Sequence, residues 1–177
     1  MTLDRDRPSS GRIWTPIDRA DKVQLWSDFN KRYKFQPGLE PEDFPGIAEP
    51  VPSITFKLAK NPTKSAYRDN FNRINMEALQ SFQSIVPAGR EMIALDWQHP
   101  CFRFMPSAVE SSNEIDWKIP VYPNGDYYIF VTESLNEGTF GHPWEHSICV
   151  FGSQLVDELG SRLGKWLTPI RIDGKST

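Results

Sequence analysis

The sequence has 177 residues, of which 38% are hydrophobic and 12% aromatic, and its formal net charge at pH 7 is −3. Such a chain is long and apolar enough to bury a core of its own, which excludes a disordered protein and removes any need for a disulfide or a structural metal. The N-terminus MTLDRDRPSSGR is too polar for a signal peptide, and no apolar run reaches the ~20 residues of a membrane span, so we expect a soluble, cytoplasmic protein.

Length favours one domain, which we place at residues 13–172, with flexible termini at 1–12 and 173–177. The two cysteines, Cys101 and Cys149, lie in apolar surroundings without the spacing of a metal site. They are therefore predicted to be buried free thiols.

Helical periodicity predicts three helices. The first covers residues 18–33, with Asp18 as its N-cap, and the second covers residues 63–86. The third begins at Ser153 and ends before a proline. The first two are separated by residues 35–52, where five prolines in 18 residues exclude a helix. The apolar stripe of the first helix is formed by Val23, Trp26, Phe29 and Tyr33.

Short β-patterned runs follow the first two helices. They are residues 53–59, 91–97, 101–106, 119–122, 126–132 and 147–151. Pro123-Asn124-Gly125-Asp126 resembles a hairpin turn with Gly125 at positive φ. The short connections leave no room for crossover helices, so the sheet is predicted to be antiparallel. The expected fold is α+β, with about five to six strands and the helices packed on one face.

Negative charge is concentrated in residues 107–160, which have a net charge of −8. The block contains one basic residue, Lys118, and nine acidic residues: Glu110, Glu114, Asp116, Asp126, Glu133, Glu137, Glu145, Asp157 and Glu158. On a shared face these carboxylates would repel nucleic acid and attract a basic protein. The alternative is that they are only solvated loop residues.

The pentad His142-Pro143-Trp144-Glu145-His146 matches the H-x-x-E-H string of inverted zinc peptidases. That chemistry needs a helix, which places both histidines beside one metal ion. Here the pentad is followed by the strand pattern SICVFG, so a structural turn, with Gly141 giving the tight geometry, is the competing interpretation. A metal site would require His142, His146 and His99, and otherwise no metal or cofactor is expected.

Polar groups beside large aromatic residues mark a candidate binding cleft. Its proposed members are Asp96, Trp97, His99, Asp126, Tyr128, His142, Trp144 and Glu145. If the loops that carry them converge, the cleft could hold a polar ligand or a peptide. The sequence contains no nucleophile elbow, phosphate loop or dinucleotide fingerprint.

Five segments of the chain are distinctive: WSDFNKRYKFQP, PGIAEPVPSITFKL, ALDWQHPCFRFMP, VYPNGDYYIFV and GTFGHPWEHSICVFGSQLV. Together they resemble the bacterial DUF2716 family of unknown function, over residues 24–158. The resemblance implies a bacterial, cytosolic protein and supplies no activity, cofactor or site residue.

These observations favour a non-catalytic binding protein, such as an immunity protein that neutralises a basic toxin. Its expected partner is another protein with a basic surface. Binding to nucleic acid or to a membrane is not expected. The alternatives are a metal-dependent hydrolase that uses His142, Glu145 and His146, and a small-molecule pocket between residues 96–100 and 140–146.

Overall fold

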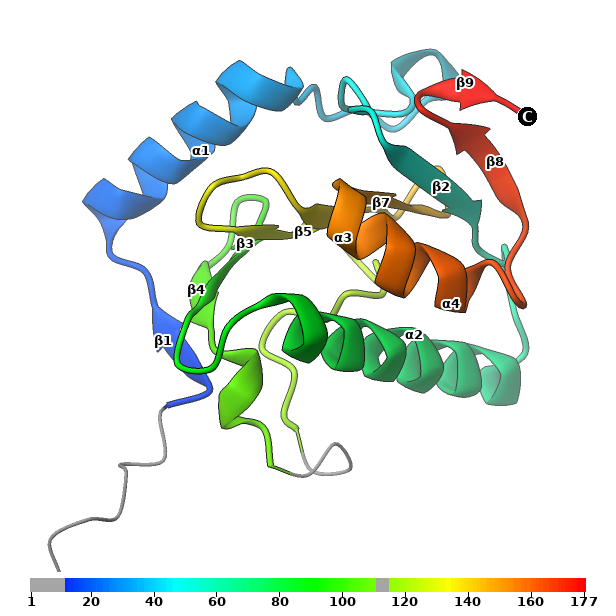
Figure 1. The fold of residues 1–177 in the computed structure, drawn as a ribbon. Helices are drawn as coiled ribbons and strands as arrows, with labels where there is room; N and C mark the ends of the chain where they lie inside the picture. The colour runs from blue at the N-terminus through cyan, green and yellow to red at the C-terminus, as the bar shows by residue number, and fades with distance from the viewer. Residues whose placement is uncertain (1–11, 111–114) are drawn as a thin grey trace, which may run out of the picture.

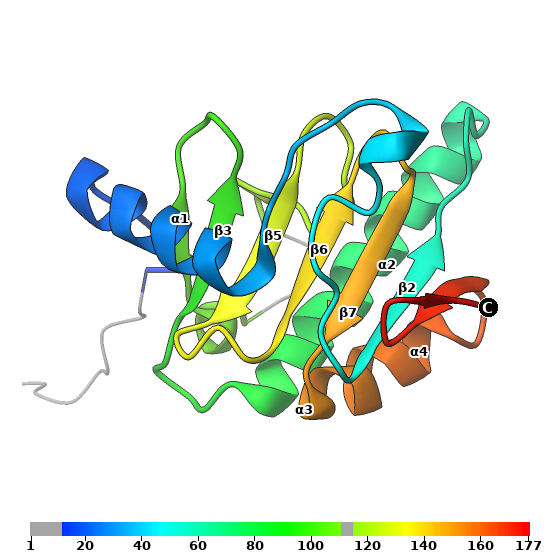
Figure 2. The same cartoon turned by 90° about the horizontal axis from the view of Figure 1, so that it is seen from above.

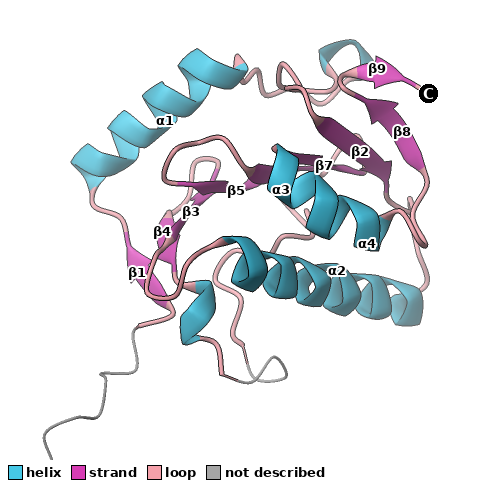
Figure 3. Ribbon diagram, in the orientation of Figure 1, coloured by secondary structure: helices cyan, strands magenta, loops and turns pink. Residues whose placement is uncertain are grey.

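The structure is a computed structural model that describes residues 12–110 and 115–177. Within these residues nine strands form one antiparallel sheet in the order β1-β4-β3-β5-β6-β7-β2-β8-β9 (Figures 1 and 3). The strands are β1 (Trp14–Pro16), β2 (Ser53–Lys57), β3 (Met92–Asp96), β4 (Phe102–Phe104), β5 (Tyr128–Thr132), β6 (Gly138–His142), β7 (Ser147–Phe151), β8 (Pro169–Ile172) and β9 (Lys175–Ser176). The α+β class and the antiparallel sheet are confirmed, but five to six strands was an underestimate.

Helices cover both faces of the sheet, so the predicted packing on one face was wrong. Helix α1 (Arg19–Tyr33) lies on one side, and α2 (Lys64–Ile85), α3 (Ser153–Leu155) and α4 (Ser161–Leu163) lie on the other (Figures 1 and 2). Strand β3 shows why: Met92 and Ala94 join one core cluster, and Ile93 and Leu95 join the other. A strand that is apolar on both faces needs a cover on each.

The first two helices begin and end as their sequences predict. Asp18 accepts a hydrogen bond from the Asp21 N–H at 2.9 Å, and Thr63 accepts one from the Ala66 N–H at 3.2 Å. Helix α1 ends at Lys34 in the left-handed conformation. None of the helices in the described residues combines the length and apolar character that crossing a membrane requires.

The C-terminal helix is interrupted. A π-helical segment, η4 (Val156–Gly160), separates α3 from α4. Leu155, Leu159 and Leu163 are nevertheless all buried in the core, so the interrupted helix keeps one apolar face. The first turn is capped by Glu137, whose carboxylate accepts a hydrogen bond from the Leu155 N–H at 2.9 Å.

Two short strands close the sheet at the C-terminus. Residues 173–177, which we expected to be a flexible tail, turn at Asp173-Gly174 and pair β9 with β8. Most of the other predicted flexible terminus, 1–11, lies outside the described residues. Cys101 and Cys149 are buried free thiols, as predicted.

Residues 119–122 form no strand, which corrects the sequence prediction. The segment is buried, but its backbone bonds to a side chain: Asn75 of α2 accepts hydrogen bonds from the N–H groups of Val121, at 2.7 Å, and Tyr122, at 3.1 Å. Because no strand precedes it, the 123–126 turn joins no hairpin, and Gly125 does not take a positive φ.

Gly141 also has a different role from the one its sequence context indicates. It lies within β6 rather than in a tight turn, and a Cβ atom built on it would be 2.9 Å from the Cβ of Pro123. Glycine is therefore required by the close approach of the 122–127 loop, not by backbone geometry.

We predict that Asn75→Ala lowers the free energy of unfolding by about 2–5 kcal/mol, because two buried N–H groups lose their acceptor. Asn72→Ala, at an exposed position of the same helix, is the matched control and should change stability by less than about 0.5 kcal/mol. Urea unfolding measures both. Equal effects of the two substitutions would contradict the assigned role of Asn75.

Candidate functional site

The candidate cleft residues all lie at one end of the sheet. The last residues of β3 and β6 and the first residues of β5 and β7 meet there, since Asp96 pairs with Tyr128 and His142 pairs with Ser147. The loops 97–101, 122–127 and 143–146 extend from this end. The structure separates the candidate residues into three groups with different burial and different chemistry.

The first group consists of Asp96, His99 and Asp126. The Nδ1 atom of His99 lies 3.0 Å from Asp96 Oδ1 and 3.1 Å from Asp126 Oδ2. Gln98, at φ 65°, turns the chain so that His99 lies over the end of β3. The carboxylates are largely covered, whereas the His99 side chain is 57% exposed. One imidazole thus joins two carboxylates, one from the end of β3 and one from the loop before β5.

Electrostatic effects connect this group with Tyr128. Burial raises the pKa of Asp96 and of Asp126 above the ordinary value, although contacts with His99 partly oppose it. The hydrogen bond with Asp96 raises the pKa of His99. Burial, with the two nearby carboxylates, raises the pKa of Tyr128 to about 12. One nitrogen and two oxygen ligand atoms lie within 4.8 Å of one another, so these residues have the donor set for a metal ion.

The second group is aromatic and centres on Tyr127, which was not among the site residues predicted from the sequence. The Tyr127 ring contacts Trp97, Trp144 and His142, with centroid distances of 5.8, 5.1 and 4.8 Å. Its hydroxyl donates a hydrogen bond to the Gly38 carbonyl at 2.7 Å. The ring therefore separates the two tryptophans, which line different surface hollows.

His142 is buried within this aromatic group. It is 1% exposed, and the Phe44 ring lies 4.6 Å from it. Nδ1 accepts a hydrogen bond from the Glu145 N–H at 3.1 Å, and Nε2 has no hydrogen-bond partner among the described residues. Burial lowers the pKa of His142 to about 4, so the imidazole is neutral at pH 7.

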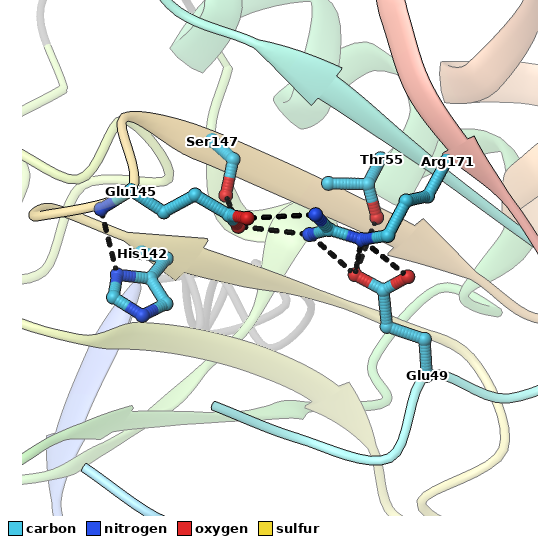
Figure 4. Close-up of polar contacts among 6 residues, drawn as sticks. All are labelled: Glu49, Thr55, His142, Glu145, Ser147 and Arg171. Carbon is cyan, nitrogen blue, oxygen red and sulfur yellow. Dashed lines mark hydrogen bonds and ion pairs between the residues drawn. The ribbon is translucent and has the colours of Figure 1, made fainter. Parts of the chain in front are cut away.

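The third group is a buried ion network around Arg171 (Figure 4). The guanidinium donates hydrogen bonds to Glu145 at 2.7 and 2.8 Å, and to Glu49 at 2.9 to 3.0 Å. Ser147 donates to Glu145 at 2.5 Å, and Thr55 donates to Glu49 at 2.7 Å. Both carboxylates and the guanidinium are thereby paired inside the protein.

Pairing decides the ionisation of this network. Burial by itself would raise the pKa of Glu145, but hydrogen bonds from Arg171 and Ser147 outweigh it and hold the pKa below its ordinary value. Burial by itself would lower the pKa of Arg171, but hydrogen bonds to Glu145 and Glu49 outweigh it and hold the pKa above its ordinary value. Both side chains are charged at pH 7.

The H-x-x-E-H string lies on the β6–β7 hairpin and not on a helix. His142 is the last residue of β6, and His146, at φ 55°, lies in the turn before β7. The glutamate is held by Arg171, and one ring nitrogen of His142 accepts a backbone hydrogen bond. Among the described residues, the group with metal-ligand spacing is Asp96, His99 and Asp126, without His142 or His146.

Arg171 and Glu49 were missed because they lie far from the motif in sequence. Arg171 lies in the segment PIRI, residues 169–172, for which no strand was predicted, and Glu49 lies in the proline-rich connection. A single arginine between isoleucines was the available signal that this segment forms a strand with a buried charge. Its carboxylate partners could not be identified from spacing.

The family model described as "Protein of unknown function (DUF2716)" matches residues 16–156. The chain belongs to the DUF2716 family. It is 30% identical over 151 residues to an uncharacterised protein, YxiI, of Bacillus subtilis (strain 168), and the match covers 82% of this chain and 91% of that protein. No solved structure matches the chain. The match confirms the resemblance to DUF2716 that the five sequence segments indicated.

We predict that Arg171→Met lowers the free energy of unfolding by about 3–5 kcal/mol, because it leaves two covered carboxylates without their cation. The matched control is Arg90→Met, which removes an exposed pair with Glu133 and should change stability by at most about 1 kcal/mol. Denaturant unfolding compares them. A loss for Arg171→Met as small as the control's would contradict a stabilising network.

His142 predicts a pH dependence of stability. Its folded pKa of about 4 lies below the ordinary 6.5, so between these values the unfolded chain binds more protons and stability falls as pH decreases. The loss attributable to His142 is roughly 3 kcal/mol over this window. Unfolding at pH 7.0, 6.0 and 5.0 should show a shallower decline for His142→Gln than for the wild type. Parallel declines would show that His142 ionises freely in the folded state.

Proposed function

We propose that this chain is a binding protein that captures another protein, as an immunity protein captures a toxin with a basic surface. The observation that carries the proposal is an exposed groove between α1 and the turn after β3. Its volume is about 610 Å³. Its lining residues are Lys22, Val23, Trp26, Ser27, Asn30, Phe35, Pro37, Trp97 and Gln98.

The groove has the composition of a protein-binding surface. Val23 belongs to the apolar stripe of α1, yet it is 64% exposed in the groove and does not join either core cluster. Trp26 and Trp97 supply two large aromatic side chains beside it. Tryptophan is enriched among the residues that contribute most to protein–protein affinity, which supports a protein partner for this groove.

Surface charge supports a basic partner. In the −8 block, Glu137 and Glu145 are engaged inside the fold, and Asp126 is largely buried. Asp116 and Glu133 are exposed but pair with Lys118 and Arg90. Glu110 and Asp157 are also exposed, and Glu114 lies outside the described residues. Exposed carboxylates of this kind accelerate the approach of a cationic protein and make binding weaker at high salt.

The test is binding to the products of the neighbouring genes, beginning with any that have a basic surface, measured by biolayer interferometry. Val23→Asp should weaken affinity at least tenfold, because it replaces an exposed apolar side chain of the groove with a charged group that binding would have to desolvate. The matched control is Val51→Asp, since Val51 is 75% exposed and lies outside the groove. It should bind like the wild type. For all three proteins, affinity should fall between 50 and 300 mM NaCl.

Two outcomes would contradict the proposal. The first is equal affinity of the Val23→Asp and Val51→Asp variants, which would place the interface elsewhere. The second is that no neighbouring product binds at low salt. In a growth assay, expression of the wild-type chain should protect cells that produce the neighbouring protein, and the Val23→Asp variant should not.

A further inference from the structure

We propose that Asp96, His99 and Asp126 form a binding site for a divalent transition-metal ion such as Mn²⁺ or Zn²⁺. The three side chains come from the end of β3, from the following turn and from the loop before β5. Their ligand atoms lie within 4.8 Å of one another. This inference does not depend on the proposed protein partner.

The distances fit a bound metal ion as well as they fit hydrogen bonds. Nδ1 of His99 is 3.0 Å from Asp96 Oδ1 and 3.1 Å from Asp126 Oδ2. Two ligands bound at about 2.1 Å and at right angles are about 3.0 Å apart, so these separations match adjacent positions of an octahedron. A single N–H of the imidazole cannot point directly at both carboxylates.

Charge also favours a cation. Two carboxylates contribute −2, and His99 contributes at most +1. The nearby Lys22 directs its ammonium group to the His99 carbonyl oxygen at 2.5 Å, so it fixes the turn and does not pair directly with either carboxylate. A divalent ion would balance both carboxylates, and the imidazole would bind it through Nδ1.

The protein already orients each ligand. Asp126 Oδ1 accepts the Tyr127 N–H at 2.8 Å, which leaves Oδ2 facing His99. The turn that carries His99 is fixed by the His99 N–H to Asp96 carbonyl bond at 3.4 Å and by Gln98 at positive φ. Contacts of this kind, which hold a ligand in place, are typical of metal sites.

The donor set narrows the choice of ion. Carboxylate oxygens suit Mn²⁺, Mg²⁺ and Ca²⁺, whereas imidazole favours transition metals. Two carboxylates with one imidazole therefore fit Mn²⁺ or Zn²⁺. Because the His99 side chain is 57% exposed, the remaining coordination positions face solvent, where they could hold water or an oxygen-bearing ligand.

The first experiment locates the ion by NMR. The chain has three histidines, so each imidazole can be followed separately. Substoichiometric Mn²⁺ added to the full-length protein should broaden the His99 signals strongly and those of His142 and His146 much less. Equal broadening of all three, or no broadening, would overturn the proposal.

The second experiment measures affinity. Calorimetric titration with Zn²⁺ should give one ion per chain, and Asp96→Asn and Asp126→Asn should each weaken binding at least tenfold. The matched control, His146→Gln, removes a histidine outside the site and should bind like the wild type. Unchanged binding by the Asp126→Asn variant, with a circular dichroism spectrum like that of the wild type, would overturn the site.

Discussion

The pairing of Arg171 with two buried carboxylates joins three parts of the chain that are distant in sequence. Arg171 lies in β8, Glu49 in the proline-rich connection after α1, and Glu145 in the turn between β6 and β7. The Glu49 side chain is only 1% exposed, so its carboxylate needs a cationic partner inside the protein. Strand β8 therefore holds the proline-rich connection in place, and this connection covers one face of the sheet together with α1. The family model's match ends at residue 156, so a chain cut there would leave both carboxylates without this cation.

The same network explains why a peptidase-like string is a structural element here. Glu145 is fixed by Arg171 and Ser147, and its backbone N–H is accepted by His142. Burial keeps His142 neutral, and the Tyr127 ring packs against it. Every polar atom of the glutamate side chain thus serves the hairpin and its anchoring to β8. The two binding sites that we propose are instead at the surface, in the α1 groove and around His99.

The parts that the sequence predicted are those with local causes. Helices α1 and α2 follow from Asp18, Thr63 and apolar periodicity, and the β5 and β7 cores follow from apolar runs. Strand β6 was not predicted because Gly138 and Gly141 have low strand propensity. Glycine occupies these positions because neighbouring atoms lie too close to leave room for a side chain. Residues 119–122 were mistaken for a strand because sequence patterns cannot reveal that Asn75 replaces a strand partner. For the candidate site, sequence selected Asp96, His99 and Asp126 individually, but their convergence depends on the pairing of β3 with β5.

Glu145 and Arg171 should act as one energetic unit that fixes the pentad in a structural role. A double-mutant cycle of Glu145→Gln and Arg171→Met, measured by denaturant unfolding, tests this most directly. The two changes should be strongly non-additive, with a coupling free energy of about 2 kcal/mol or more, since removing the second partner of a broken buried pair does little further harm. Additive effects, within about 0.5 kcal/mol, would contradict it.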